Sequence, residues 1–381
     1  MPRILVLPGD TSACGFYRLR EPARVVAAAR PDWVINVPEP SDVKMGLDER
    51  RRLVSLSGVE RPNEYDLVVM QRAGTPAQLQ LMRWFQSTGA AVILDTDDAM
   101  WAIDRENVAW NAWNGAPGMA NWRYLDEAAA MADLVTVTTQ GLAKHYGKHG
   151  RAEVLPNCIP AWAAEVGGPV RSRRGEYGDD LTFGWAGYTS THPRDLNALG
   201  RSMAAFLDFA PFAKFRVVGD SDGASTAWGV PVEHVAPAEL GQDYYRALTT
   251  FDVGVVPLQD HAFNRSKSAL KALEMATAGL PVVASGTPAN REFAKTMPTV
   301  FIADSEREWV YALSHAASPD VIAEAATVGR EVVRNLWTYE ARAQHWIAAW
   351  TRAMKRRRMI DGKPYDDLDG IAAELVGLTW Q

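Results

Sequence analysis

Cysteine is scarce in this chain, and long apolar runs are missing. Cys14 and Cys158 are its only cysteines, and neither belongs to a CxxC pair or a Cys/His cluster. This argues against a disulfide framework or a zinc site and fits a reducing compartment. No stretch approaches about 18 apolar residues, and the apolar run before Pro8 is too short for a signal peptide. We therefore expect a cytoplasmic protein without a transmembrane segment.

A surplus of positive charge is also lacking. The formal net charge is −6 at pH 7, which removes the long-range attraction that most nucleic-acid-binding proteins use to gather phosphates. A nucleic-acid partner is therefore disfavoured. The chain has no GxxxxGK[ST], HExxH or GxGxxG motif, so a P-loop, a zinc protease and a dinucleotide-binding site lack their signatures.

What the chain does contain is a regular alternation of short β-branched runs and helical patterns. Helical periodicity falls at 20–29, 76–89 and 125–132. Continuous apolar runs of this length are typical of strands buried on both faces, and alternation with helices predicts a parallel, doubly wound α/β sheet. In the first half the predicted strands are 3–8, 32–38, 66–71, 91–96, 133–139 and 152–157.

The alternation stops at a polar, glycine-rich and arginine-rich stretch and then restarts. We expect domain 1–166, linker 167–180, second domain 181–337, a helix at 338–358 that packs back on the first domain, and a tail at 359–381. Two such Rossmann-like domains would face each other across a cleft at the carboxyl ends of their sheets. In the second half the predicted strands are 181–187, 215–220, 232–237, 252–257, 280–285 and 299–304.

The most specific stretch is FNRSKSALKALEMATAGLPVVAS, residues 263–285. Ser266 or Ser268 can cap a helix that runs to about Ala278. Lys267, Lys271 and Glu274 would then share one helical face, with the lysines near a helix start that favours anions. A diphosphate at the lysines would leave a ribose near the carboxylate. A solvated stripe of charges with an internal pair explains the same spacing.

This stretch resembles the donor-binding signature of GT-B glycosyltransferases close to glycosyltransferase family 4. There, Lys-Ser, a second Lys and a Glu precede Gly-x-Pro-Val-Val-Ala-Ser. The resemblance implies that Glu274 binds the nucleotide ribose and that Lys267 and Lys271 bind the diphosphate. Many members carry a glutamate at the position of Ser266, near the transferred sugar, so sugar recognition in this chain should differ.

Two further stretches resemble the same family. FGWAGYTSTHPRDL (183–196) is similar to the first strand and loop of the donor domain, which implies close phosphate approach at Gly184 and Gly187 and contact from His192 or Arg194. A structural histidine is the alternative. LPGDTSACGFYRLREPA (7–23) is similar to the first loop of the acceptor domain, with three residues facing the cleft. These three residues are Gly15, Tyr17 and Arg18. For Tyr17 and Arg18, a capping and packing role is the alternative.

The acidic run Asp95-Thr96-Asp97-Asp98 invites a metal site, since hard oxygen ligands suit magnesium or manganese. The run belongs to the first domain, however, whereas the diphosphate motif belongs to the second and already supplies positive charge. We therefore expect no metal and no other cofactor. By resemblance Asp97 stands where many relatives have a histidine that faces the transferred sugar. Asp98 would lie on the acceptor side, and a helix or turn cap is its alternative role.

The resemblance thus implies a retaining, metal-independent enzyme that uses a nucleoside diphosphate sugar, with Asp97 and Lys267 as catalytic residues. The rivals are a nucleotide-sugar epimerase or DNA glycosylating enzyme on the same fold, and a non-catalytic sugar-nucleotide-binding protein. The Ala-, Arg- and Trp-rich composition is similar to that of actinobacterial and phage proteins. The acceptor is then a glycan, a lipid or a virion or cell-surface protein. The tryptophan-rich segment 101–122 suits either a packed insertion or an aromatic platform.

Overall fold

The computed structural model describes residues 1–49, 53–115, 120–166, 181–192, 194–219 and 231–362. The chain forms two compact units. Unit 1 comprises Met1–Trp101, Asn111–Asn157 and Arg342–Gln381, and unit 2 comprises Ala102–Trp110 and Cys158–Ala341. The predicted linker 167–180 and nearly all of the predicted tail lie outside the described residues. No helix in the described ranges is both long and apolar enough to cross a membrane.

Unit 1 is built on a six-stranded parallel sheet with the order β2-β1-β5-β6-β7-β8. The order reverses between β1 and β5, so the loops that follow these two strands flank the crevice where open α/β sheets bind ligands. Every residue of β5 and β6 is buried, which explains their apolar runs 67–70 and 91–94, and each strand ends in buried polar residues. The strands are β1 (Arg3–Leu7), β2 (Val34–Asn36), β5 (Leu67–Gln71), β6 (Ala91–Thr96), β7 (Leu134–Val137) and β8 (Ala152–Val154).

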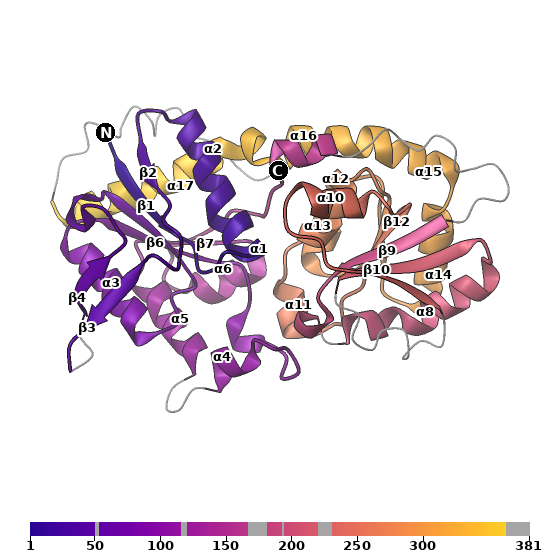
Figure 1. Ribbon diagram of the computed structural model, residues 1–381, viewed down its shortest axis with the longest axis horizontal. Helices are drawn as coiled ribbons and strands as arrows, with labels where there is room; N and C mark the ends of the chain where they lie inside the picture. The colour runs from indigo at the N-terminus through magenta and orange to yellow at the C-terminus, as the bar shows by residue number, and fades with distance from the viewer. Residues whose placement is uncertain (50–52, 116–119, 167–180, 193, 220–230, 363–381) are drawn as a thin grey trace. The chain divides into compact units, whose positions relative to one another are not determined.

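Helices connect these strands and lie on both sides of the sheet (Figure 1). An antiparallel hairpin of β3 (Lys44–Leu47) and β4 (Leu53–Ser57) was not predicted, because most of its residues are partly or fully exposed and give no apolar run. The helices are α1 (Ala13–Gly15), the π-helix η1 (Phe16–Arg20), α2 (Glu21–Ala29), the short 3-10 turns η2 (Pro62–Glu64) and η3 (Met100–Ala102), α3 (Pro76–Ser87), α4 (Trp110–Asn114), α5 (Asn121–Met131) and α6 (Gln140–Tyr146).

The last helix, α17 (Tyr339–Ile360), groups with unit 1 from Arg342 onward. Trp350 is buried and stacks on Trp33, with ring centroids 6.5 Å apart and an interplanar angle of 17°. Arg352 pairs with Glu153 at 2.5 Å. Apolar stacking and peripheral ion pairs therefore hold this helix on unit 1.

Unit 2 is built on a second six-stranded parallel sheet, with the order β11-β10-β9-β12-β13-β14 and its switch point between β9 and β12. Apolar side chains such as Phe183, Phe206 and Phe215 fill its core. The prediction of an α/β fold with two doubly wound sheets is confirmed. The strands are β9 (Leu181–Gly187), β10 (Ala213–Gly219), β11 (Val232–Val235), β12 (Val253–Val256), β13 (Val282–Ser285) and β14 (Val300–Ala303).

The helices of unit 2 cover its sheet (Figure 1). They are α7 (Ala161–Val166), the 3-10 turn η4 (Thr189–Thr191), α8 (Asp195–Phe209), α10 (Gln242–Leu248), α11 (Ala262–Ser266), α12 (Leu270–Thr277), α13 (Pro288–Thr296), α14 (Glu306–Ala316), α15 (Pro319–Glu324), the π-helix η5 (Ala325–Gly329) and α16 (Arg330–Leu336).

Candidate functional site

The lysine- and glutamate-containing motif of unit 2 folds as two helices, α11 and α12, rather than one. Lys267 separates them with extended backbone angles, φ −65° and ψ 150°. The predicted cap at Ser266 or Ser268 is therefore wrong. Ser266 is the last residue of α11 and donates its Oγ to the carbonyl of Ala262 at 3.0 Å. The residue that precedes α12 is Ala269, and it has no side-chain acceptor for the first N–H groups of that helix.

The break also changes the position of Lys267. The prediction that Lys267 shares a helical face with Lys271 and Glu274 is wrong, because Lys267 lies before α12 begins. Its Nζ lies 4.8 Å from the centroid of the Phe263 ring. Lys267 thus holds its charge over a ring of α11, and it precedes the first residue of α12, Leu270, by three positions in the sequence.

Glu274 is buried, with 2% of its surface exposed, and it belongs to a three-member network. Tyr244 on α10 donates its hydroxyl to Glu274 Oε2 at 2.7 Å, and Lys271 Nζ lies 3.1 Å from the same oxygen. Lys271 also donates to the Tyr244 hydroxyl at 3.0 Å. Burial and the neighbouring Glu274 carboxylate raise the pKa of Tyr244, so its hydroxyl keeps the proton that it donates. The internal Lys271–Glu274 pair is the alternative noted from the sequence, whereas Tyr244 was missed because it lies 30 positions away.

His192 lies in the loop after β9 and is held by Asp195. Its Nδ1 is 3.0 Å from Asp195 Oδ2. Burial and the nearby charge of Lys267 lower the pKa of His192 to about 4, against the opposing effect of Asp195. His192 is therefore neutral at pH 7, and Nδ1 carries the proton that the carboxylate accepts. In the protein without ligand His192 therefore adds no positive charge at pH 7, and its contact with a phosphate stays a prediction.

Asp195 joins three parts of this edge of the sheet and was not identified from the sequence. Besides His192, its Oδ1 accepts from the backbone N–H of Gln259 at 2.9 Å and from Asn264 Nδ2 at 2.7 Å. Burial raises the pKa of Asp195, but the hydrogen bond and charge of His192 and the bond from Gln259 outweigh it, so the net shift is downward. This carboxylate fixes the loop after β9 against α11.

Arg194 is committed to carboxylates within unit 2. Its Nη2 lies 2.7 Å from Asp104 and its Nε 3.1 Å from Glu106, both in the tryptophan-rich segment.

Gly184 and Gly187 have packing reasons for lacking a side chain. A Cβ at Gly184 would lie 2.1 Å from the Phe251 ring, and one at Gly187 would lie 2.9 Å from the Trp185 ring. The expected role of these glycines in phosphate approach is therefore not needed to explain them.

In unit 1 the first-loop residues are interior, and the prediction that Tyr17 and Arg18 face a cleft is wrong. Each is 1% exposed. Arg18 forms a two-pronged ion pair with Asp95, at 3.0 and 2.7 Å, and donates to the carbonyl of Leu155 at 2.7 Å. Gly15 is needed because a Cβ there would lie 2.0 Å from the Asp10 carbonyl oxygen. The packing alternative is what the geometry supports.

Arg72, which no sequence motif pointed to, binds two carboxylates of the acidic run, Asp97 and Asp98. Arg72 Nη2 lies 2.6 Å from Asp97 Oδ1 and 3.3 Å from Asp98 Oδ2, and it donates to Cys14 Sγ at 3.1 Å. Burial raises the pKa of Asp97, but the charges of Arg72 and Arg18 outweigh it, so the carboxylate is ionised. Arg72 has a φ of 50°, a left-handed conformation rare outside glycine and more frequent at functional sites.

The three carboxylates of this run therefore bond arginines. Asp95 pairs with Arg18, and Asp97 and Asp98 pair with Arg72. Within the ranges that the structure describes, no group of three or more His, Cys, Asp or Glu side chains is arranged to hold a metal ion.

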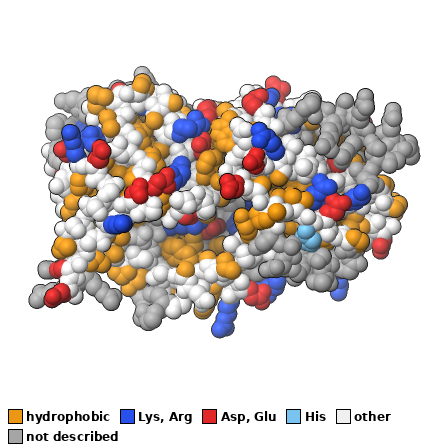
Figure 2. All heavy atoms as spheres, viewed as in Figure 1, with side chains coloured by type: hydrophobic (Ala, Val, Ile, Leu, Met, Phe, Trp, Pro, Cys, Tyr) orange, Lys and Arg blue, Asp and Glu red, His pale blue; other side chains and the backbone are white. Residues whose placement is uncertain are grey.

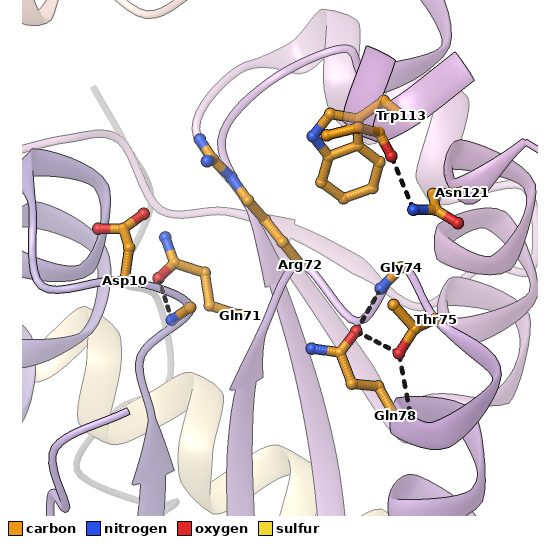
Figure 3. A pocket seen from close by; sticks show the side chains of 10 residues that line it. Asp10, Gln71, Arg72, Gly74, Thr75, Gln78, Trp113 and Asn121 are labelled. Carbon is orange, nitrogen blue, oxygen red and sulfur yellow. Dashed lines mark hydrogen bonds between the residues drawn. The ribbon is translucent and has the colours of Figure 1, made fainter. Parts of the chain in front are cut away.

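A cavity of about 250 Å³ lies in unit 1 at the switch point of its sheet. Figure 3 shows the side chain of Arg72 between those of Gln71 and Trp113. The predicted site residues Asp97 and Asp98 do not line this cavity, but both pair with Arg72, which does. Its lining comes from the loops after β1 and β5, the start of α3, and α4 and α5: Gly9, Asp10, Gln71, Arg72, Gly74, Thr75, Gln78, Ala112, Trp113 and Asn121.

Surface charges of both signs lie close together. On the face shown in Figure 2, Lys and Arg side chains alternate with Asp and Glu among the described residues, and no extended basic patch gathers there. This distribution agrees with the negative net charge.

Comparison with known proteins identifies residues 197–348 as matching a family model described as glycosyl transferase-like. This region contains Tyr244, Lys267, Lys271 and Glu274. A comparison with curated proteins finds no match.

Solved structures match the fold over nearly the whole chain. Sucrose-phosphate synthase from Thermosynechococcus elongatus is 16% identical with a TM-score of 0.61, covering 95% of this chain and 100% of that one. A UDP-forming α,α-trehalose-phosphate synthase from Burkholderia xenovorans is 13% identical with a TM-score of 0.55, covering 92% and 99%. A structure described as "Trehalose-6-phosphate from E. coli bound with UDP-2-fluoro glucose" is 12% identical with a TM-score of 0.56, covering 93% and 99%. The chain has the GT-B fold, and together with the family match this supports a glycosyltransferase.

Proposed function

We propose that the chain transfers a sugar from a nucleoside diphosphate sugar to an acceptor, with the donor bound by unit 2 and the acceptor by unit 1. The observation that carries the proposal is the buried Glu274 of α12, held by Tyr244 and Lys271. All of these residues lie in the region that matches the glycosyl transferase-like model. Names of similar structures mention UDP, which makes UDP-sugars the first donors to test.

The charges of unit 2 suit a departing diphosphate. Lys267 lies in the short segment between α11 and α12, and the residue that precedes α12, Ala269, offers no side-chain cap. Fixed cations and helix N–H groups stabilise the negative charge that grows on the leaving group, which is the task a metal performs elsewhere. We therefore propose that the reaction is metal-independent and needs no cofactor. His192 is neutral without ligand, so Lys267 and Lys271 carry this role.

The ribose of the donor would meet Glu274, because a carboxylate accepts from two neighbouring hydroxyls. In unit 1, Asp97 is ionised and is held by Arg72, which lines the cavity. We propose that Asp97 favours the positive charge that develops at the anomeric carbon and that transfer retains configuration. Both proposals rest on the resemblance together with this ionised carboxylate.

A screen of nucleotide sugars tests the function. The melting temperature of the full-length protein is measured with UDP-, GDP-, dTDP- and ADP-sugars, because a ligand that binds only the folded state raises it. Release of nucleoside diphosphate is then measured with the stabilising donor, with and without candidate acceptors. Stabilisation and release by one donor class support the proposal. The absence of both with every donor would contradict it.

A further inference from the structure

We propose that the cavity of unit 1 binds one neutral, hydroxyl-bearing sugar ring and rejects the phosphorylated form of that sugar. The role of this ring as the acceptor rests on the proposed function. Its binding to unit 1 stands on the cavity itself.

Gln71 carries an unsatisfied donor at this cavity. Its side chain is buried, with 2% exposed, and Oε1 accepts from the backbone N–H of Gly9 at 2.9 Å. Its Nε2 is buried and has no hydrogen-bond partner within the described residues. Buried amide donors without partners are rare because they cost free energy, so a ligand oxygen at this position would stabilise the site.

Trp113 supplies an apolar surface on the same cavity. A Cβ at Gly74 would lie 2.5 Å from the Trp113 ring, so the ring packs against bare backbone, and Figure 3 shows it above Gly74 and Thr75. Small-ligand sites combine such aromatic surface with a few placed polar groups. A sugar ring matches this combination because its C–H face is apolar and its rim carries hydroxyls.

The charges at the cavity argue against an anionic ligand. Arg72 is the only cation among the lining residues, and it is paired with both Asp97 and Asp98. Asp10 adds a third carboxylate. Its Oδ1 accepts from Ser12 and from the backbone N–H of Gly15, and among the described residues no hydrogen bond to Oδ2 is found. A phosphate here would meet net negative charge, whereas a hydroxyl can donate to that oxygen.

The start of α3 does not offset this repulsion. The backbone N–H of Gly74 donates to Gln78 Oε1 at 3.0 Å, and the N–H of Gln78 donates to Thr75 Oγ1 at 3.3 Å. These donors are already used within the helix cap. The volume of about 250 Å³ lies below the range of roughly 300–1,000 Å³ that is usual for larger ligands. One ring fits this size better than an oligosaccharide.

Ligand-observed NMR on the full-length protein tests the proposal without any donor. The probes are the methyl α-glycosides of glucose, mannose, galactose and N-acetylglucosamine, each paired with its 6-phosphate. At least one neutral glycoside should bind. Its 6-phosphate should bind at least about tenfold more weakly, because the phosphate is repelled by the carboxylates at the cavity. Equal or tighter binding of the phosphate would overturn the proposal, as would absence of binding by every neutral probe.

Two variants with matched controls locate the binding. Trp113→Ala should weaken glycoside binding about tenfold, whereas Trp122→Ala, outside the cavity lining, should change it less than about twofold.

Gln71→Glu keeps the acceptor for Gly9 but removes the free donor, so it should also weaken glycoside binding about tenfold. Gln80→Glu is its control, because Gln80 likewise accepts a backbone N–H, from Leu53, at 2.8 Å. Equal affinity in the wild type and both cavity variants would place the sugar elsewhere and overturn the proposal.

The affinity for UDP, measured on the same samples, separates this proposal from the function. Both cavity variants should retain the wild-type value. Glycoside binding without UDP binding would overturn the donor site and leave the inference on unit 1 standing.

Discussion

At the residue scale, the assignments depend on which charges are already paired. The sequence predicted that Arg18 and Arg194 bind ligand, yet each forms an ion pair with a carboxylate of its own unit. Arg72 lies one position beyond β5 and pairs with Asp97 and Asp98 of the acidic run. A sequence gives the types of charged residue but not their partners, because these partners are separated by many positions.

Asp97 and Asp98 should differ in what their replacement costs. Asp97→Asn removes an ionised partner of Arg72, so we expect unfolding free energy to fall by about 2 kcal/mol and turnover to slow by roughly 10², with nucleotide affinity unchanged. Asp98→Asn, whose contact with Arg72 is longer, should cost about 1 kcal/mol with little effect on turnover. Chemical denaturation and steady-state kinetics measure both. The reverse pattern would exchange the two roles.

His192 should make stability depend on pH. Its pKa is about 4 in the folded protein against an ordinary value of about 6.5, so the unfolded state binds more protons between these values. Stability therefore falls as pH drops through this window, by about 2 kcal/mol between pH 7 and pH 5 from this group. Urea unfolding at both pH values should show a smaller loss for His192→Gln than for the wild type. Identical losses would refute the assignment.

At the scale of elements, α17 contributes through its packing on unit 1. Trp350 is buried and stacked on Trp33, so Trp350→Ala should lower the unfolding free energy by about 3–5 kcal/mol, as is typical of large-to-small core changes. Met359→Ala on the same helix is the control, since Met359 is 69% exposed and should change stability by less than about 0.5 kcal/mol. Denaturation curves compare them. Equal, small effects would show that the stacking contributes little.

The strands of the two parallel sheets could be predicted from the sequence, because strands buried on both faces leave apolar runs. The exposed β3–β4 hairpin leaves no such run and was missed. The break at Lys267 could not be predicted. Residues 266–278 contain no Pro or Gly, so local propensity favours one continuous helix, and only the tertiary structure holds Lys267 extended. Contacts that follow local spacing could be predicted, as for the pair of Lys271 with Glu274, whereas the ligand-binding role of these residues stays a prediction. Contacts that depend on distant partners were missed, as for Tyr244 and Asp195.

For the molecule as a whole, the proposed function gives fixed cations of unit 2 the role that a metal has in other enzymes. Transfer activity should persist after dialysis against EDTA, with a rate within about twofold of the untreated rate, since the lysines and the start of α12 supply the stabilisation. Loss of activity in EDTA and its return with manganese would contradict this. Circular dichroism before and after treatment serves as the control for folding.

The most direct test of the account is the affinity of the full-length protein for UDP, measured by calorimetry in the wild type and in Glu274→Gln. UDP should bind the wild type, and Glu274→Gln should weaken binding by about 1.5–3 kcal/mol, the value of a hydrogen bond to a charged group. Glu292→Gln is the matched control, because Glu292 pairs with Lys295 at the same separation in sequence as Glu274 and Lys271, but on an exposed surface. This variant should bind UDP as the wild type does. Absence of UDP binding by the wild type, or equal affinity in all three proteins, would contradict the central claim that unit 2 holds the donor nucleotide at Glu274.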